Sequence, residues 1–595
     1  MGGSVASLGL QVRRQALTEV PRPIVSVVPD VSGIDRQFDY RVPNELVSRL
    51  GLGSLVKVPL AGRTVAGWVV AVDSPSGDAS RELHDVLAVA GPSVEPDVVE
   101  LTSWVAERWF GSRRAVLASA SAPRVRQRPV TSRRGRVTAG SDGPVVRATK
   151  NALSSGGGLV VIPPLFSALA AVETVALNGP VLVVCPTHRM ARLGAASLRR
   201  RGFTTAEIPD QWELARAGTD VVIGARSAVF APCPDLSAIV VVDEHDEAMK
   251  EERSPAWDAL AVACERGRRS GVPVVATSPT PSAAALVAMR DSMHAIEDSS
   301  GWPSIIVEDL SALPVKGSLL GRHLLALASP ADSSIACVVG AKGGARLLAC
   351  ASCGVLQLCS CGTALHRDAN GALTCARCQK TFGTVCVRCG RTTLKILRGG
   401  SAHFRRELAQ SIGREVLEIT SDTSEDWVLG RVFVGTEAVL RRVAAVDAVV
   451  FVDVDGDLAA PRTGAVRDVL ARVALAARMV GRGGQIVIQT RQPGSPVLVA
   501  LSGGNPARDL ATWMDKDVAA RRAMGLPPFG RMVRIRYSGS AEHVSLPEVA
   551  GVDVASIGDG VLARSTDEDA LARFVGAVRE AGGREVRISA DPWRY

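Results

Sequence analysis

The sequence contains few lysines and few aromatic residues, and it has no long apolar run. Only eight of its 69 basic residues are lysines, and Phe, Trp and Tyr together make up 4% of 595 residues. None of the lysines follows a glycine and precedes Ser or Thr, so the chain has no Walker A loop, the lysine-bearing turn that holds a nucleoside triphosphate.

Segments for export or for membrane insertion are also absent. The first 17 residues lack a charged start followed by an apolar stretch, because Arg13 and Arg14 interrupt it. The least charged run, 151–172, is broken by three glycines and by Pro163-Pro164, so it cannot supply the roughly 20 apolar residues of a membrane span. We therefore expect a soluble cytoplasmic protein with no membrane partner.

What the chain does have is length, an ordinary globular composition and a localised positive charge. Its length predicts about three to five domains, and 47% hydrophobic with 22% charged residues is typical of a folded protein. In the segment 111–150, ten basic residues stand against one acid, Asp142, while the other 555 residues carry 59 of each sign. The whole net charge of +9 therefore lies in this segment, which is either a solvated linker or a segment that contacts nucleic-acid phosphates.

Eight of the twelve cysteines lie close together in the sequence. They form four pairs, Cys350 and Cys353, Cys359 and Cys361, Cys375 and Cys378, and Cys386 and Cys389. A gap of two residues lets both thiolates of a pair face one ion, so four pairs predict two tetrahedral zinc sites, with two Zn²⁺ per chain. Zinc would take the place of the hydrophobic core that so short a segment cannot build.

The remaining cysteines and the histidine of this region have simpler interpretations. His366 falls inside the cluster, but eight thiols already complete two sites, so we expect it on the surface. The other four cysteines each stand alone among apolar neighbours and are expected to be small core residues. They are Cys185, Cys233, Cys264 and Cys337.

The apolar pattern changes once along the chain. Short runs separated by Pro and Gly predict a β-rich first domain, followed by a helix over 97–110. These runs are 24–28, 38–42, 54–58 and 66–70. From about residue 158, near-continuous apolar runs alternate with helical stretches, as in parallel strands covered on both faces. These later runs are 181–184, 221–223, 239–242, 272–275, 432–434, 449–452 and 485–488. They predict two doubly wound α/β lobes, with the cysteine segment inserted in the second.

An acidic cluster follows one of these strands directly. The run 239–242 leads into Asp243, Glu244, His245 and Asp246. At this position nucleotide hydrolases use an Asp to hold Mg²⁺ and a Glu to polarise water. The turn where the phosphate loop would lie, 163–167, reads Pro-Pro-Leu-Phe-Ser and supplies neither the backbone donors nor the lysine. Asp243 and Glu244 are therefore interpreted as vestigial catalytic residues.

Four motifs occur in a characteristic order. They are Phe38-Asp39-Tyr40 followed by Val56-Lys57-Val58-Pro59, the segment 224–232 (GARSAVFAP) before the acidic strand, the cysteine array, and the segment 521–529 (RRAMGLPPF). In this order the chain resembles, over most of its length, the PriA family of bacterial replication-restart proteins, which are superfamily 2 DNA helicases. The resemblance implies a multidomain α/β protein with a β-rich 3′-end DNA-binding domain, two RecA-like helicase lobes, an inserted two-zinc cysteine-rich region and a small α+β C-terminal domain.

The resemblance also implies domain boundaries and zinc ligands. The expected parts are an N-terminal tail at 1–20, the 3′-end DNA-binding domain at 21–112, a basic linker or reduced winged-helix region at 113–150, a degenerate RecA-like lobe 1 at 151–325, a degenerate RecA-like lobe 2 at 326–349 and 396–500, the zinc-binding region at 350–395, and the C-terminal domain at 501–595. By the family's interleaved pattern, Cys350, Cys353, Cys386 and Cys389 would hold one zinc, and Cys359, Cys361, Cys375 and Cys378 the other. The single-residue gap in Cys359-Ser360-Cys361 departs from that pattern.

Further departures concern the chemistry of ATP. The acidic motif is one residue short of the family's Asp-Glu-Glu-His, and the turn 277–281 (TSPTP) carries proline where the family has alanine. Arg482 fits the first arginine of an arginine finger, but Gln485 stands where the second is expected. An arginine finger is worth about 10³ to 10⁵ in rate. The sequence therefore favours a helicase fold that is not an ATP-driven enzyme, and it leaves ATP and Mg²⁺ doubtful as cofactors.

Candidate DNA contacts follow from the same resemblance. Asp39 could accept a hydrogen bond from a terminal 3′ hydroxyl, and Phe38 and Tyr40, which share one face of a strand, could stack on a base or fill the core. Arg226 could contact a phosphate or brace its loop. The basic segment adds six arginines, Arg124, Arg126, Arg128, Arg133, Arg134 and Arg136.

The predicted function is replication restart. The chain is expected to bind stalled or branched DNA forks, including the nascent 3′ end, and to promote primosome assembly and replicative helicase loading without helicase activity of its own. The alternatives are an active ATP-dependent 3′-to-5′ DNA helicase of the primosome and a zinc-ribbon DNA-binding protein outside replication restart. Expected partners are forked or single-stranded DNA, primosome components, single-strand DNA-binding protein, and the replicative helicase or its loader, all at the nucleoid.

Overall fold

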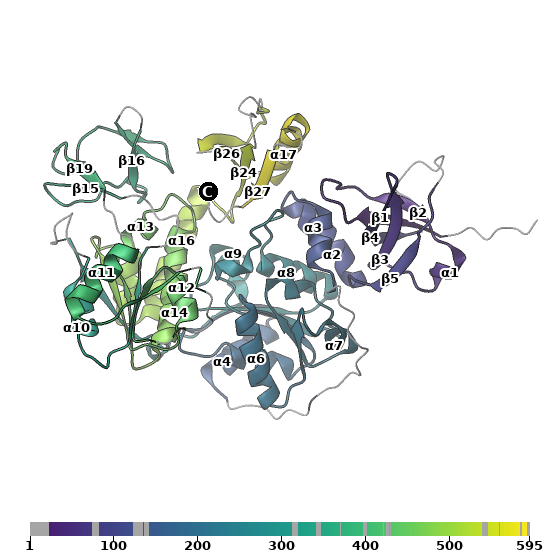
Figure 1. Cartoon of the computed structure of the whole chain (residues 1–595), viewed down its shortest axis with the longest axis horizontal. Helices are drawn as coiled ribbons and strands as arrows, with labels where there is room; N and C mark the ends of the chain where they lie inside the picture. Colours follow the sequence, from purple (N-terminus) through teal and green to yellow (C-terminus); the bar gives the residue numbers. More distant parts are fainter. Residues whose placement is uncertain are drawn as a thin grey trace, which may run out of the picture.

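A computed structural model shows the arrangement of the domains (Figure 1). It describes residues 23–73, 83–122, 135, 142–311, 319–340, 347–368, 371–396, 401–420, 422–423, 428, 430–537, 546–557, 560–582 and 586–591. Among these residues no helix is both long enough and apolar enough to cross a lipid bilayer. The mixed α/β, multidomain architecture expected from the sequence is confirmed.

The first domain is a five-stranded antiparallel sheet in the order β2-β1-β4-β3-β5. Its strands are β1 (Ile24–Pro29), β2 (Phe38–Arg41), β3 (Ser54–Leu60), β4 (Arg63–Val72) and β5 (Ala88–Pro92), with the short helix α1 (Asn44–Val47) at one end. Alternate residues of each strand point inward, so that Val25, Val27, Val56 and Val58 form a buried core. The strands predicted from the apolar runs are therefore present.

Two helices join this sheet to the rest of the protein. They are α2 (Pro96–Arg108) and α3 (Arg113–Ser119), and Trp68 on β4 donates a hydrogen bond from Nε1 to Ser121 Oγ at 2.8 Å, just after α3. The basic linker was expected to begin at residue 113, but Arg114 in α3 pairs with Asp30 at 2.6 Å. The amphipathic pattern of α3 places Val116 and Leu117 in the core, so this first part of the basic segment is ordered structure.

The first α/β lobe is a seven-stranded parallel sheet in the order β12-β6-β11-β10-β7-β9-β8. Its strands are β6 (Gly157–Val161), β7 (Val181–Val184), β8 (Thr205–Ile208), β9 (Val221–Gly224), β10 (Ala238–Val241), β11 (Val274–Ser278) and β12 (Met293–Ala295). Its helices are α4 (Pro144–Ser154), α5 (Leu169–Ala176), α6 (His188–Arg200), α7 (Trp212–Ala217), α8 (Ala259–Ser270) and α9 (Ala283–Ala288). Helix α4 packs on β6 and α5, so the lobe includes residue 144 rather than starting at 151.

The second lobe is a six-stranded parallel sheet in the order β13-β23-β22-β14-β21-β20. Its strands are β13 (Ser304–Asp309), β14 (Ile335–Val338), β20 (Leu417–Ile419), β21 (Val432–Gly435), β22 (Ala448–Phe451) and β23 (Gln485–Thr490). Its helices are α10 (Arg322–Ala328), α11 (Ser401–Ile412), α12 (Ala438–Arg442), α13 (Asp455–Leu458) and α14 (Ala465–Val480). Because β13 pairs with β23, this lobe starts before residue 326, the boundary expected from the sequence.

The cysteine-rich region lies above the second lobe in Figure 1 and is built from two small sheets. One pairs β15 (Leu348–Cys350) with β19 (Leu394–Ile396), and the other contains β16 (Leu365–Arg367), β17 (Leu373–Cys375) and β18 (Thr381–Phe382). Its buried apolar residues form two small clusters, one with Leu348, Leu365 and Leu373 together with cysteines and one with Leu347, Ala349, Leu356 and Ala364. Such a small core is consistent with the expectation that a bound metal holds the region together.

The C-terminal part begins with two helices that belong to the lobes rather than to a separate domain. Helix α15 (Pro496–Ser502) packs on β13, and α16 (Pro506–Ala523) packs on α9. The small α+β domain therefore starts later than residue 501. It consists of β24 (Arg531–Tyr537), β25 (Asp553–Ile557), β26 (Gly560–Ser565), β27 (Val586–Ala590) and α17 (Glu568–Gly582), in the sheet order β25-β26-β24-β27.

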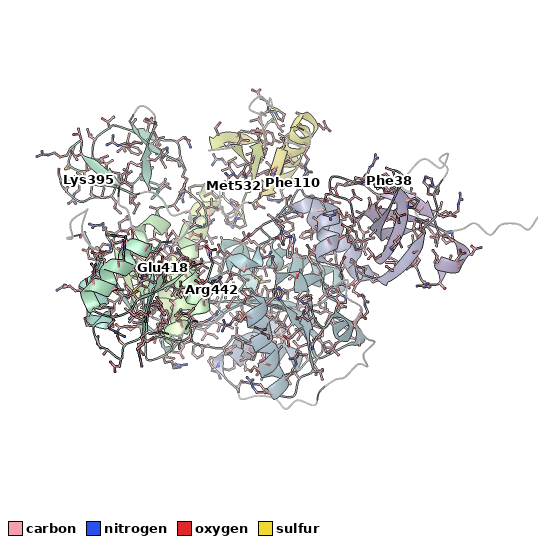
Figure 2. The ribbon with its side chains drawn as sticks, viewed as in Figure 1. Phe38, Phe110, Lys395, Glu418, Arg442 and Met532 are labelled. Atoms are coloured by element: carbon pink, nitrogen blue, oxygen red, sulfur yellow. The ribbon has the colours of Figure 1, made fainter. Side chains whose placement is uncertain are left out.

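Helix α2 contacts both the first lobe and the C-terminal domain. It packs on α8 of the first lobe, where Arg266 pairs with Asp97 at 3.2 Å. At its other end Arg108 pairs with Glu568 of α17 at 2.8 Å, and Arg531 donates a hydrogen bond to the carbonyl oxygen of Arg108 at 2.6 Å. The guanidinium carbon of Arg531 also lies 5.6 Å from the centre of the Phe110 ring, and Figure 2 labels Phe110 and Met532 in this region.

Candidate functional site

The acidic cluster lies at the carboxyl end of β10, where parallel sheets place their ligand sites. Asp243, Glu244, His245 and Asp246 are all buried. Asp243 adopts a left-handed backbone conformation with φ of 53°, which is uncommon for a residue other than glycine. Its backbone N–H donates to Thr277 Oγ1 of β11 at 3.3 Å, so the neighbouring strand holds this turn in place.

Both carboxylate oxygens of Asp243 bind an arginine of the second lobe. Two nitrogens of the Arg478 guanidinium, in the last turn of α14, donate to the two carboxylate oxygens of Asp243 at 2.5 and 2.7 Å. Burial would raise the pKa of Asp243, but the charge and hydrogen bonds of Arg478 outweigh it and the pKa is lowered. The carboxylate that would hold Mg²⁺ in a nucleotide hydrolase thus forms a bidentate ion pair between the lobes.

Two further arginines of the second lobe approach the same turn. Arg441 of α12 pairs with Asp246 at 3.1 Å and with Glu437 on its own helix. Arg467 of α14 donates to the carbonyl oxygen of Pro281 in the first lobe and pairs with Asp517 of α16 at 2.7 Å. Three arginines therefore connect the lobes around the acidic cluster.

Glu244 and His245 are occupied within the first lobe. Glu244 accepts a hydrogen bond from the Ser282 backbone N–H at 2.8 Å, and burial raises its pKa to about 7. His245 Nδ1 lies 2.8 Å from Ser278 Oγ, and burial lowers its pKa. Both side chains therefore bind groups at the end of β11 or just after it.

The turn after β6 offers few backbone donors to a phosphate. Pro163 and Pro164 have no backbone N–H, and the N–H groups of Leu165 and Phe166 donate to the carbonyl oxygens of Gly301 and Pro163 at 3.1 and 3.0 Å. A phosphate would find none of these donors available.

Arg482, the expected first arginine of a finger, does not contact the acidic cluster. Its guanidinium carbon lies 5.6 Å from the centre of the Phe166 ring, and one nitrogen donates to the Ser300 carbonyl oxygen at 3.2 Å. The arginine that does reach Asp243, Arg478, stands four residues earlier. Sequence reasoning missed it, because its partner Asp243 lies 235 residues away along the chain.

The eight cysteines of the array come together in two groups of four. Within each group every Sγ lies within 4.8 Å of the others, and the groups are Cys350, Cys353, Cys386 and Cys389, and Cys359, Cys361, Cys375 and Cys378. Within each group, two pairs of sulfur atoms lie 3.4 to 3.7 Å apart. Four sulfurs bound tetrahedrally at about 2.3 Å from zinc would be about 3.8 Å apart, so these donors fit a tetrahedral thiolate site. His366 is exposed on β16 and belongs to neither group of thiols.

A buried glutamine orients the first of these groups. The Nε2 of Gln357 donates to Cys386 Sγ at 3.5 Å, and its Oε1 accepts from the Val387 backbone N–H at 3.0 Å. The backbone N–H of Arg388 donates to the same sulfur at 3.4 Å. Such donors stabilise a thiolate and fix its direction. Nothing in the cysteine spacing pointed to Gln357, because its partners lie 29 and 30 residues further along the chain.

The aromatic and acidic candidates of the first domain have different surroundings. Tyr40 is 3% exposed and its hydroxyl donates to the Pro59 carbonyl oxygen at 3.1 Å, so it fills the core. Phe38 is half-buried beneath Arg36, whose guanidinium carbon lies 4.8 Å from the ring centre, and Figure 2 labels it at the upper side of the domain. Asp39 lies on the opposite face of β2 and accepts a hydrogen bond from Ser26 Oγ at 2.6 Å.

The arginine candidates divide into one described residue and six others. Arg226 donates to the Ala248 carbonyl oxygen at 3.2 Å and pairs with Glu251 at 3.1 Å, so it braces the loop before β10. Arg124, Arg126, Arg128, Arg133, Arg134 and Arg136 lie outside the described residues.

Comparison with known proteins relates this chain to one group. A family model for a 3′ DNA-binding domain (3′BD) matches residues 26–122, which include the first sheet, α2 and α3. The replication restart protein PriA of Treponema pallidum is 24% identical over 585 residues, covering 87% of this chain and 86% of that protein. The probable replication restart protein PriA of Mycobacterium tuberculosis is 26% identical over 576 residues, covering 84% of each.

Other matches are shorter. The PriA of Thermotoga maritima is 24% identical over 433 residues, so the chain spans 58% of that protein, and it spans 47% of the Synechocystis PriA. Among solved structures, S. cerevisiae Dbp5 L327V bound to RNA and ADP BeF3 aligns with a TM-score of 0.34 and 11% identity, covering 62% of this chain and 87% of that one. This alignment is too loose to add to the sheet topology.

The ion pair between the lobes can be tested by removing its cation. Arg478→Met should destabilise the protein by about 3 kcal/mol, because it leaves the buried Asp243 carboxylate without a partner. Thermal unfolding monitored by circular dichroism measures the loss. Arg482→Met is the matched control, since that arginine is exposed and its loss should change stability by less than about 0.5 kcal/mol. Adding Asp243→Asn to Arg478→Met should restore part of the stability. Equal stability of the wild type and the Arg478→Met single variant would contradict this account.

Proposed function

Because this chain is a relative of the replication restart protein PriA, we propose that it works in replication restart by binding stalled or branched DNA forks, including the nascent 3′ end, without helicase activity of its own. The observation that carries the second half of this proposal is the bidentate pair between Arg478 and Asp243. It occupies the carboxylate needed for Mg²⁺, next to a turn that offers no phosphate cradle.

Capture of DNA is assigned to the first domain and to the basic segment that follows it. We assign the six arginines from Arg124 to Arg136 to phosphate contacts, since the stretch 124–136 contains no acidic residue and its like charges repel one another unless an anion binds. Asp39 is the candidate for the 3′ hydroxyl and Phe38 for stacking on a base. Tyr40 is assigned to the core, because its ring is buried, and Arg226 to the support of its loop.

The two groups of four thiols are assigned to one Zn²⁺ each. Four thiolates are the ligand set that structural zinc prefers, and the metal would supply the stability that this small region lacks. We place primosome components, single-strand DNA-binding protein, and the replicative helicase or its loader among the partners. These partners would meet the protein on forked DNA at the nucleoid, in the cytoplasm.

The absence of ATP hydrolysis is the most direct test. On forked DNA the wild-type chain should show no DNA-stimulated ATPase activity above background, and Asp243→Ala or Glu244→Ala should leave that background unchanged. Release of inorganic phosphate measures it, with an active DNA helicase assayed in parallel. Clear turnover that either substitution abolishes would overturn the proposal and favour an ATP-dependent 3′-to-5′ helicase.

Fork binding by the basic segment is tested through its salt dependence. Replacing the six arginines by glutamine should weaken fork binding and reduce the slope of log K against log salt by up to about 5, because each lost phosphate contact removes about 0.9. Fluorescence anisotropy with a labelled fork at several salt concentrations measures both quantities. A control variant with six exposed arginines replaced elsewhere should keep most of the slope. These are Arg200, Arg253, Arg268, Arg290, Arg406 and Arg508. Equal slopes for the two variants would refute the assignment.

The metal assignment predicts a count. The purified chain should contain two zinc ions, and Cys353→Ser should reduce the content to about one because three thiolates hold zinc more weakly than four. Elemental analysis by mass spectrometry gives the number. Cys264→Ser, a half-buried cysteine of α8 outside the array, is the control and should retain two. A wild-type chain purified without chelator that contains no zinc would sink the assignment.

A further inference from the structure

A cavity of about 520 Å³ lies beside the acidic cluster, and it has no part in the function proposed above. Its walls are the turn after β6, helices α5 and α6, and the end of α14 with the residues that follow it. Three buried side chains close its floor, Val183 on β7, Ile223 on β9 and Val242 just after β10. These strands are adjacent in the sheet, so the cavity occupies the carboxyl-end crevice where α/β proteins bind ligands.

The lining of this cavity is mostly apolar. Phe166, Leu169, Met190 and Leu193 contribute side chains, the N–H groups of Leu165 and Phe166 are already bonded, and Pro164 has none. The space therefore suits the hydrocarbon body of a ligand and not a triphosphate. Its volume falls within the range of about 300 to 1,000 Å³ typical of small-molecule sites.

Two residues of α6, Leu193 and Gly194, lie at the wall of the cavity. Leu193 is 60% exposed, which is costly for a large apolar side chain unless something covers it. Gly194 stands in the interior of the helix, where glycine costs about 1 kcal/mol relative to alanine. A Cβ at this position would lie 3.2 Å from Ile223 Cδ1, so the glycine leaves free the space above the floor.

The cavity has two charged residues among the described residues that line it, Arg478 and Arg482, and both belong to the second lobe. Arg478 is held by Asp243 through both of its terminal nitrogens, whereas Arg482 is exposed and makes one hydrogen bond, to the Ser300 carbonyl oxygen. A guanidinium has five N–H donors, so Arg482 can still bind an anionic group at the rim.

We propose that this cavity binds a small aromatic or aliphatic organic acid. The apolar body would rest on Val183, Ile223 and Val242 and cover Leu193, and the acid group would pair with Arg482. Because the lining comes from both lobes, such a ligand would bridge them where a nucleotide does so in an ATP-driven protein. The site is independent of DNA binding and adds to the proposed function.

The probe for the experiment is 1-anilinonaphthalene-8-sulfonate, which combines an apolar ring system with one anionic group. Fluorescence titration of the folded, full-length wild type should show one saturable site per chain. Leu193→Arg and Gly194→Phe should each weaken binding at least tenfold, the first by placing charge at the rim and the second by filling the space. Arg482→Met should weaken it severalfold.

Leu177→Arg is the matched control. Leu177 is also an exposed leucine, 42% accessible at the end of α5, but it does not line the cavity, so this variant should bind the probe as the wild type does. Binding that does not saturate, or that is equally tight in Leu193→Arg, would overturn the proposal. Displacement of the probe by a non-hydrolysable ATP analogue would overturn it as well, because the cavity would then be a nucleotide site. Fork binding by the same variants stays a separate readout, so failure of this proposal leaves the fork-binding role standing.

Discussion

The bidentate ion pair between Arg478 and Asp243 joins the two lobes at the acidic turn. In a nucleotide-driven helicase the ligand supplies the charges that draw the lobes together, whereas here an arginine of α14 pairs directly with the acidic turn of the first lobe. Breaking such a pair leaves one buried charge without compensation, which is costly. Arg441 and Arg467 add contacts around the same turn, so the junction does not depend on a single link. Side chains of the chain itself therefore join the two lobes.

Other features of the molecule agree with lobes that are joined by their own side chains. The turn after β6 carries two prolines and no lysine, and the neighbouring crevice is mostly apolar. The first domain and the cysteine-rich region lie around the lobes and not between them (Figure 1).

The sequence was sufficient to predict the helices and strands, but it was not sufficient to predict the contacts between them. Continuous apolar runs such as 181–184 and 239–242 are buried strands because only covered sheets have that pattern. Domain boundaries shifted because α4, β13 and α15 have patterns that show an apolar face without showing which core it joins. Arg478 escaped notice because its partner lies 235 residues away, and Tyr40 could be assigned to the core only once the burial of its ring was known.

The contact of α2 with the C-terminal domain has a consequence for biosynthesis. Arg108 and Glu568 are 460 residues apart, so at about 5 to 20 residues per second the ribosome needs roughly 20 to 90 s after α2 emerges before α17 can meet it. The first sheet can fold early on its own core, but the outer end of α2 stays without its final partner throughout that interval. Only a chain translated past α17 can form this junction, so the contact forms late in synthesis.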